Sequence, residues 1–205
     1  MKENYSEKCE EILKNIKNKK KLLLHSCCAP CSSYVISYLT NYFDITILYY
    51  NPNIYPYEEY MKRKEEQIKL INTINKIHKL DIIDCEYDNK KYNELIKGLE
   101  KEPEKGKRCT ICYKMRMEKT AKIAKENNYD YFCTTLSVSP FKNATLINEI
   151  GKQLEEEYNI NWLYSDFKKK DGYKKSIELS QKYNLYRQNY CGCVYSKQIL
   201  FHISN

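Results

Sequence analysis

The stretch Lys21-Leu22-Leu23-Leu24-His25-Ser26-Cys27-Cys28-Ala29-Pro30-Cys31 joins a short apolar run to a group of three cysteines. Leu22–Leu24 is apolar at successive positions, which is typical of a parallel strand buried on both faces. The cysteines follow this run directly, so we expect them at the carboxyl end of the strand. Ligands of open α/β proteins bind at that edge of the sheet. The stretch therefore predicts a central strand that leads into a functional site.

Four further apolar runs have the length of strands, namely Ile45–Tyr50, Ile82–Cys85, Tyr131–Leu136 and Trp162–Tyr164. Segments with helical spacing alternate with these runs, namely Tyr5–Asn18, Glu58–Lys79, Thr110–Asn127, Pro140–Tyr158 and Tyr173–Tyr183. Ser139-Pro140 is expected to begin the fourth of these helices, because a serine cap followed by proline is a common helix start. The alternation predicts a single α/β domain over residues 1–205, with a mostly parallel sheet of about five strands.

The chain has 205 residues and ten cysteines. It contains no apolar run near the roughly 20 residues that a transmembrane helix needs. Its first residues also lack the apolar stretch of a signal peptide. We therefore expect a cytoplasmic protein without a membrane partner. Cysteines in that reducing compartment more often serve metal binding or redox chemistry than disulfide bonds.

Seven of the cysteines form three groups, which are Cys27, Cys28 and Cys31, then Cys109 and Cys112, then Cys191 and Cys193. Cys85 and Cys133 lie in apolar runs and are expected to be small core residues, whereas Cys9 lies on a charged helix. The second group is expected at the start of a helix, where the helix dipole lowers thiol pKa values. Gly192 gives the third group the freedom to make a tight turn.

Three kinds of chemistry fit the grouped cysteines: a structural zinc site, an iron–sulfur cluster and disulfide chemistry. Four thiolates satisfy one zinc ion or one cluster, so seven suggest a cluster with a second metal or a redox-active dithiol. The first strand ends in His25-Ser26-Cys27-Cys28 rather than in a glycine-rich phosphate loop, which argues against a dehydrogenase or an ATP-driven ligase. The net charge of +8 is compatible with nucleic-acid binding, but it can equally reflect a lysine-rich composition.

The order and spacing of these motifs resemble the epoxyqueuosine reductase QueH family from about Lys21 to Ser196. Besides the opening stretch, the resemblance rests on Asn51-Pro52-Asn53-Ile54-Tyr55-Pro56, Glu58-Glu59-Tyr60, Arg108-Cys109-Thr110-Ile111-Cys112-Tyr113, Arg116, Thr134-Thr135-Leu136, Ser139-Pro140, Ser165-Asp166-Phe167 and Tyr190-Cys191-Gly192-Cys193. Residues 1–20, with the N-terminal helix, lie outside the matched region.

The resemblance implies reduction of epoxyqueuosine to queuosine at the wobble position of tRNAs with GUN anticodons, with loss of the epoxide oxygen as water. This is the last step of queuosine biosynthesis, and in this family it needs no cobalamin. The resemblance further implies a Rossmann-like (HUP-type) α/β fold with helices on both faces of the sheet. It implies a [4Fe-4S] cluster with a nearby iron ion, and an external electron donor such as a ferredoxin or flavodoxin.

We expect the seven grouped cysteines to be the metal ligands. The proton donors are expected among residues at the predicted edge, namely His25, Tyr113, Tyr164, Asp166 and Tyr190. His25 can equally be a core histidine. The loop with Asn51, Asn53 and Tyr55 is expected to read the modified base, although it can also be a rigid connector. Arg108 and Arg116 are expected to bind substrate, with tRNA contacts from Lys62, Arg63, Lys64, Lys107, Lys114, Lys142 and Lys168–Lys170.

Two other functions remain open from the sequence. A zinc-stabilised RNA-binding module would use the cysteines without catalysis. A thiol–disulfide oxidoreductase would use Cys109 and Cys112 at a helix start. The latter would leave five grouped cysteines without a role.

Overall fold

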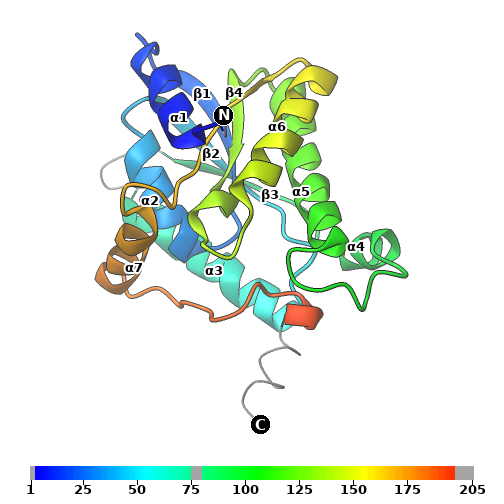
Figure 1. Cartoon of the computed structure of the whole chain (residues 1–205). Coiled ribbons are helices and arrows are strands. Elements are labelled where there is room, and N and C mark those ends of the chain that lie inside the picture. The colour runs from blue at the N-terminus through cyan, green and yellow to red at the C-terminus, as the bar shows by residue number, and fades with distance from the viewer. Residues whose placement is uncertain (1–2, 75–79, 197–205) are drawn as a thin grey trace.

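The computed structural model of the chain describes residues 3–74 and 80–196, and its centre is a five-stranded parallel sheet (Figure 1). The strand order is β3-β2-β1-β4-β5. The strands are β1 (Lys20–His25), β2 (Phe43–Tyr49), β3 (Asp81–Asp84), β4 (Tyr131–Thr134) and β5 (Asn161–Trp162). All four strand pairs are parallel. The α/β fold with a parallel sheet, expected from the sequence, is thereby confirmed.

The helices cover both faces of this sheet. They are α1 (Tyr5–Lys14), α2 (Ala29–Leu39), α3 (Tyr57–Ile74), α4 (Asn89–Leu95), α5 (Lys107–Glu126), α6 (Ala144–Tyr158) and α7 (Gly172–Lys182). Helices α5 and α6 pack together on one side, and α2 contacts α3 and α7 on the other (Figure 1). This division follows from right-handed crossovers, because the chain winds from β1 towards β3 and then returns to β4 and β5. No described helix is both long enough and apolar enough to cross a bilayer.

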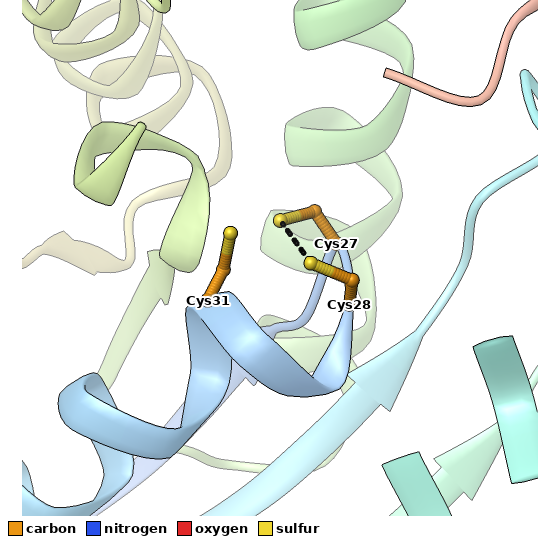
Figure 2. A group of neighbouring side chains, drawn as sticks. All are labelled: Cys27, Cys28 and Cys31. Atoms are coloured by element: carbon orange, nitrogen blue, oxygen red, sulfur yellow. Dashed lines mark hydrogen bonds between the residues drawn. The ribbon is translucent and has the colours of Figure 1, made fainter. Parts of the chain in front are cut away.

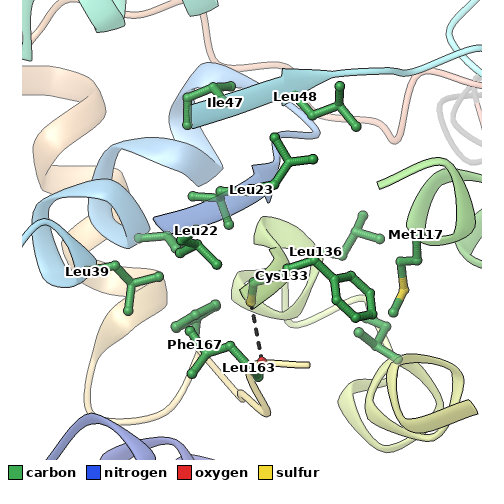
Figure 3. Close-up of a cluster of buried hydrophobic side chains, with 14 of the residues drawn as sticks. Leu22, Leu23, Leu39, Ile47, Leu48, Met117, Cys133, Leu136, Leu163 and Phe167 are labelled. Carbon is green, nitrogen blue, oxygen red and sulfur yellow. Dashed lines mark hydrogen bonds between the residues drawn. The ribbon is translucent and has the colours of Figure 1, made fainter. Parts of the chain in front are cut away.

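The core lies on both faces of β1. Leu22, Leu23 and Leu24 are all fully buried, with 0% of their surface exposed. Figure 3 shows Leu22 and Leu23 within a cluster that includes Met117 of α5 and Leu39 of α2. Burial on both faces explains why the run is apolar at successive positions rather than at alternating ones.

The three isolated cysteines have separate surroundings. Cys133 is buried in β4, and its thiol donates to the carbonyl of Leu163 at 3.4 Å (Figure 3). Cys9 lies on α1 and faces the core with 4% exposure, so the helix is charged only on its outer side. Cys85 was expected inside a strand, but β3 ends one residue earlier and Cys85 is only partly buried.

Two sequence-based boundaries around β4 were wrong. The strand ends at Thr134 and not at Leu136, because the Thr134 side chain accepts from the Leu136 amide at 3.3 Å and turns the chain into the short 3-10 helix η1 (Thr135–Val138). The expected helix start at Ser139-Pro140 is also wrong. Asn143 caps α6 instead, through a bond from the Leu146 amide to its Oδ1.

The remaining differences concern element ends and short helices. Strand β5 covers only Asn161–Trp162 and does not reach Tyr164. The helices α2 and α4 were not among the predicted segments, and Pro30 stands in the first turn of α2, where its missing N–H costs nothing. The end of the expected Glu58–Lys79 helix lies outside the described residues, which show it as far as Ile74.

Gly151 of α6 offers a test of how tightly the edge of the sheet is packed. A Cβ at this position would lie 2.2 Å from Cε2 of Trp162, whose ring is held by a bond from Nε1 to Asn148 Oδ1 at 3.1 Å. Gly151→Ala should therefore lower the free energy of unfolding by about 1–3 kcal/mol through overpacking. Lys152→Ala, exposed on the same helix, should change it by less than about 0.5 kcal/mol. Urea titration measures both, and equal midpoints would contradict the packing.

Candidate metal centre

The first cysteine group forms a compact set of thiols where β1 passes into α2. The sulfur atoms of Cys27, Cys28 and Cys31 all lie within 4.8 Å of one another, and those of Cys27 and Cys28 are 3.9 Å apart. Figure 2 shows the three side chains pointing towards one another from the turn. Cys28 is the extended residue that caps α2, which places Cys31 in the first helical turn. The local backbone thus gathers three thiols from a stretch of five residues.

Contacts from the neighbouring strand loops fix this turn. The Cys27 amide donates to Thr135 Oγ1 at 3.1 Å, and the Thr135 hydroxyl lies 3.4 Å from the Cys27 sulfur. Asn51, which follows β2, donates from Nδ2 to the Ser26 carbonyl at 2.8 Å. Loops after β1, β2 and β4 therefore meet at the carboxyl edge of the sheet, as the topology requires.

The second group lies on the first turns of α5. Cys109 and Cys112 are both buried, and the Cys109 sulfur accepts from the Lys105 amide at 3.3 Å. Burial raises the pKa of Cys112, and nearby Cys191 raises it further, while Arg116 lowers it. The second and third groups are therefore close enough to interact electrostatically.

The third group lies on the irregular segment after α7, directly before the helical residues 194–196. Contacts with α3 and α5 hold this part of the chain. Tyrosine rings of this segment stack on cations in three pairs, namely Lys62 on Tyr186 at 3.7 Å, Arg63 on Tyr190 at 4.9 Å and Arg108 on Tyr195 at 4.4 Å. Arg63 also donates from Nη1 to the Cys191 carbonyl at 3.0 Å, and Tyr55 donates its amide to the Gly192 carbonyl at 2.9 Å. These contacts place the Cys-Gly-Cys turn against α3 and the β2 loop.

Positive side chains surround the thiols. Arg63 and Arg116 are only 1% and 2% exposed, and Lys142 is partly buried with its Nζ 3.0 Å from the Cys191 sulfur. Burial alone would lower the pKa of Arg116, but Cys112, Cys191 and Cys27 hold it above its usual range. Arg116 thus interacts with one cysteine from each of the three groups. The pKa of Lys142 is likewise held well above its usual range, chiefly by Cys191 against the effect of burial.

Cysteine sulfurs are the groups that can supply most of the countercharge of these cations. Arg63 pairs with Glu59 at 2.6 Å, but within the described residues Arg116 and Lys142 have no carboxylate partner. Buried charges are normally paired. Thiolates, which metal binding requires, would supply the missing negative charge.

Several polar atoms around the thiols are buried without a partner among the described residues, namely Nη2 of Arg63, Nη2 of Arg116, the hydroxyl of Tyr113 and Oδ1 of Asn53. Each unpaired buried group costs about 1–3 kcal/mol. The grouped cysteines offer thiols that can bind iron, and Arg63 and Arg116 offer N–H groups that can donate hydrogen bonds to sulfur. The residues fit an iron–sulfur centre.

Comparison with known proteins shows the family of the chain. The family model described as epoxyqueuosine reductase QueH matches residues 22–199. The chain belongs to the QueH family. The chain is 48% identical to the epoxyqueuosine reductase QueH of Staphylococcus epidermidis over 180 residues, which cover 86% of this chain and 76% of the relative. It is 37% identical to that of Thermotoga maritima, over 85% of this chain and 89% of the relative. The family predicted from the sequence is confirmed.

A solved structure supports the fold. The U34-tRNA thiolase NcsA from Methanococcus maripaludis, solved with its [4Fe-4S] cluster, aligns with a TM-score of 0.56 over 94% of this chain and 67% of that chain. The identity is 15%, so the likeness concerns the fold alone.

His25 lies beneath the cysteine turn of this QueH member and is fully buried. Its Nε2 is 3.1 Å from the Tyr50 carbonyl, and its Nδ1 is 2.8 Å from Thr134 Oγ1. Because a carbonyl only accepts, Nε2 carries the proton and Nδ1 accepts from the Thr134 hydroxyl. Burial lowers the pKa of His25 to about 3, so the ring is neutral. Both ring nitrogens are hydrogen-bonded to residues at the carboxyl edge of the sheet. The expected role of His25 in proton transfer stays a prediction.

The other expected proton donors lie in different surroundings. Tyr113 is 1% exposed and flanked by Lys142, whose Nζ is 5.6 Å from the ring centre. Asp166 pairs with Lys168 at 2.6 Å and lines a cleft of about 600 Å³ between α1, α2 and α7, which none of the grouped cysteines lines. Tyr164 donates to Glu155 at 2.9 Å. Of this set, the structure brings Tyr113 and Tyr190 to the cysteines.

The residues expected to bind substrate divide by burial. Asn51 and Asn53 are each 1% exposed, and Asn51 Oδ1 accepts from Arg116 Nη1 at 3.2 Å. Arg108 is buried as well, and its Nη1 donates to three carbonyls, those of Leu99, Glu100 and Glu102. Tyr55, by contrast, is 52% exposed. Among these residues Tyr55 is the one that a large substrate can touch directly.

Sequence reasoning missed the inward roles of Arg63 and Lys142, which it treated as surface contacts for tRNA. Their partners are 128 and 49 residues away in the chain. No local pattern marks such pairs. The only available signal was the position of Lys142, three residues after Ser139 in a loop at the predicted carboxyl edge of the sheet.

Gly192 tests whether the Cys-Gly-Cys turn belongs to the centre. Its φ is +110°, and an added Cβ would lie 2.7 Å from Arg63 Nη1. Gly192→Ala should destabilise the protein by about 1–3 kcal/mol through backbone strain and displace the guanidinium as well. We expect a lower iron and sulfide content after anaerobic purification.

Gly98→Ala is the matched control, since Gly98 has φ +84° and nothing within 4 Å of an added Cβ. It carries backbone strain without a clash, so its iron content should match the parent. Equal iron in the two variants would show that the turn does not hold the metal.

Proposed function

We propose that this chain reduces epoxyqueuosine in tRNA to queuosine. Two electrons and two protons enter, the carbon–oxygen bonds of the epoxide break, and the oxygen leaves as water. The observation that supports the proposal most is that one cysteine from each of the three groups raises the pKa of the buried Arg116, in a member of the QueH family. Neither a binding module nor a dithiol enzyme needs all three groups.

We assign the seven grouped thiols to a [4Fe-4S] cluster and an additional iron ion. A cluster takes four thiolates, which leaves thiols for a further metal. Tetrahedral thiolates about 2.3 Å from one metal are roughly 3.8 Å apart, and the separations within the first group are of this size. When bound, the cluster supplies single electrons and the iron supplies Lewis acidity towards the epoxide oxygen. The electrons come from an external donor such as a ferredoxin or flavodoxin, and cobalamin is not required.

The chain itself contributes charge and a proton at the site. Burial raises the pKa of Tyr113, so its hydroxyl keeps its proton at neutral pH and can donate a hydrogen bond to the leaving oxygen. Arg116 and Lys142 place positive charge where negative charge develops on that oxygen. His25 and Asn51 hold the strand loops in position. The reactive nucleoside, turned out of the anticodon loop, reaches these groups past Tyr55.

The proposal is tested with anaerobically purified full chain and tRNA that carries epoxyqueuosine. We expect several irons and inorganic sulfide per chain, and conversion to queuosine by nucleoside mass spectrometry with a chemical or protein reductant. Stoichiometric zinc without sulfide would contradict it and favour a zinc-stabilised RNA-binding module. Activity that survives iron removal would instead favour thiol–disulfide chemistry.

Lys142 gives a sharper test of the centre. Lys142→Met removes both the hydrogen bond to the Cys191 sulfur and a positive charge, so metal affinity or turnover should fall by about 10- to 100-fold. Removing that charge should also lower the reduction potential of the loaded protein, measured by spectroelectrochemical titration. Lys142→Arg should keep part of both properties.

The control is Lys114→Met, an exposed lysine on α5. This variant should keep the parental potential and iron content. If Lys142→Met and Lys114→Met behave alike, the contact with Cys191 has no role in the centre.

A further inference from the structure

Two aromatic side chains on loops next to the cysteine centre are largely exposed, so their rings contribute little to the core. Phe141 is 60% exposed and Tyr55 is 52% exposed, which places both among the few large apolar side chains that the described chain leaves open. Phe141 lies on the loop between β4 and α6, and Tyr55 lies on the loop between β2 and α3. Both loops leave the carboxyl edge of the sheet.

The local backbone turns each ring outwards next to a residue that points inwards. The Phe141 amide donates to Ser139 Oγ at 3.3 Å, and the next side chain, Lys142, reaches the Cys191 sulfur. Ile54, just before Tyr55, is 1% exposed, while the Tyr55 amide donates to Gly192. The two loops that carry the rings thus both contact the Cys191–Cys193 turn.

We propose that Phe141 and Tyr55 are stacking platforms for unpaired nucleobases next to the nucleoside that enters the centre. The inference rests on the proposed function. A base that reaches buried thiols must leave its stack, and its neighbours then lose a stacking partner. Aromatic side chains replace that partner in proteins that bind single-stranded RNA, with little dependence on sequence.

Exposed lysines beside the second cysteine group favour RNA over an apolar partner. Lys105, Lys107 and Lys114 are exposed at the start of α5, close to the cysteines at positions 109 and 112. They can meet phosphates while the rings take the bases. The rings stand on separate loops rather than in one apolar patch, which suits single bases better than a protein interface.

The test measures RNA binding apart from catalysis. The probe is a fluorescent anticodon stem-loop with unmodified guanosine at the wobble position, titrated with anaerobically purified full chain. Phe141→Ala and Tyr55→Ala should each raise the dissociation constant by about fivefold to a hundredfold. Phe141→Trp should bind at least as tightly as the parent. A stem without the loop should bind equally to all variants.

Ile68→Ala is the control, because Ile68 is an exposed apolar residue on α3, with 39% exposure. It should leave the affinity unchanged, and iron content should be the same in all variants. Parental affinity in both ring variants would overturn the proposal. The proposal would also be overturned if the ring variants lost only the reduction driven by a protein electron donor and kept dithionite-driven reduction. The rings would then bind that donor. Weaker RNA binding in a chain that reduces no epoxyqueuosine would uphold the stacking role while the proposed function fails.

Discussion

Arg63 and Arg116 carry their guanidinium groups into the protein interior, and Lys142 turns its ammonium group against a cysteine sulfur. Such charges are stable inside a protein only when opposite charge lies beside them. One carboxylate, from Glu59, pairs with Arg63, and cysteine thiols are the groups near these cations that can carry the remaining negative charge as thiolates. The cations and the cysteines therefore depend on each other. Without thiolates the cations would be uncompensated, and without cations several adjacent thiolates would repel one another.

The sheet topology makes this arrangement possible. β1 and β4 are neighbours, and the chain leaves them towards opposite faces of the sheet, which opens a crevice at their carboxyl ends. A crossover helix runs antiparallel to the strands, so the first turns of α3 and α5 lie at the same edge. That geometry brings Arg63, Cys109 and Cys112 to the turn that follows β1. The third cysteine group lies in an irregular turn just before the helical residues 194–196, and the cation–π contacts of Tyr190 and Tyr195 hold that turn on both sides.

Much of this could be predicted from local pattern. The apolar run Leu22–Leu24 marked the central strand, and the cysteines after it marked the site, because both signals lie within one short stretch. The C-terminal end of β4 and the start of α6 were missed, because side-chain caps from Thr134 and Asn143 set these boundaries instead of the Ser-Pro signal. Burial of Asn51 and Arg108 was also missed. A polar residue in a loop looks exposed until the fold supplies its partners from elsewhere in the chain.

The inward turn of the cations also changes what the charge of +8 means. Several basic residues expected to touch tRNA have their charge engaged within the protein, among them Arg63, Arg108 and Arg116. These groups cannot neutralise phosphates. Salt dependence of RNA binding grows by about 0.7–0.9 in log–log slope for each phosphate neutralised. The slope for this protein should therefore follow the exposed lysines alone, and be smaller than the total charge suggests, because part of that charge compensates sulfur.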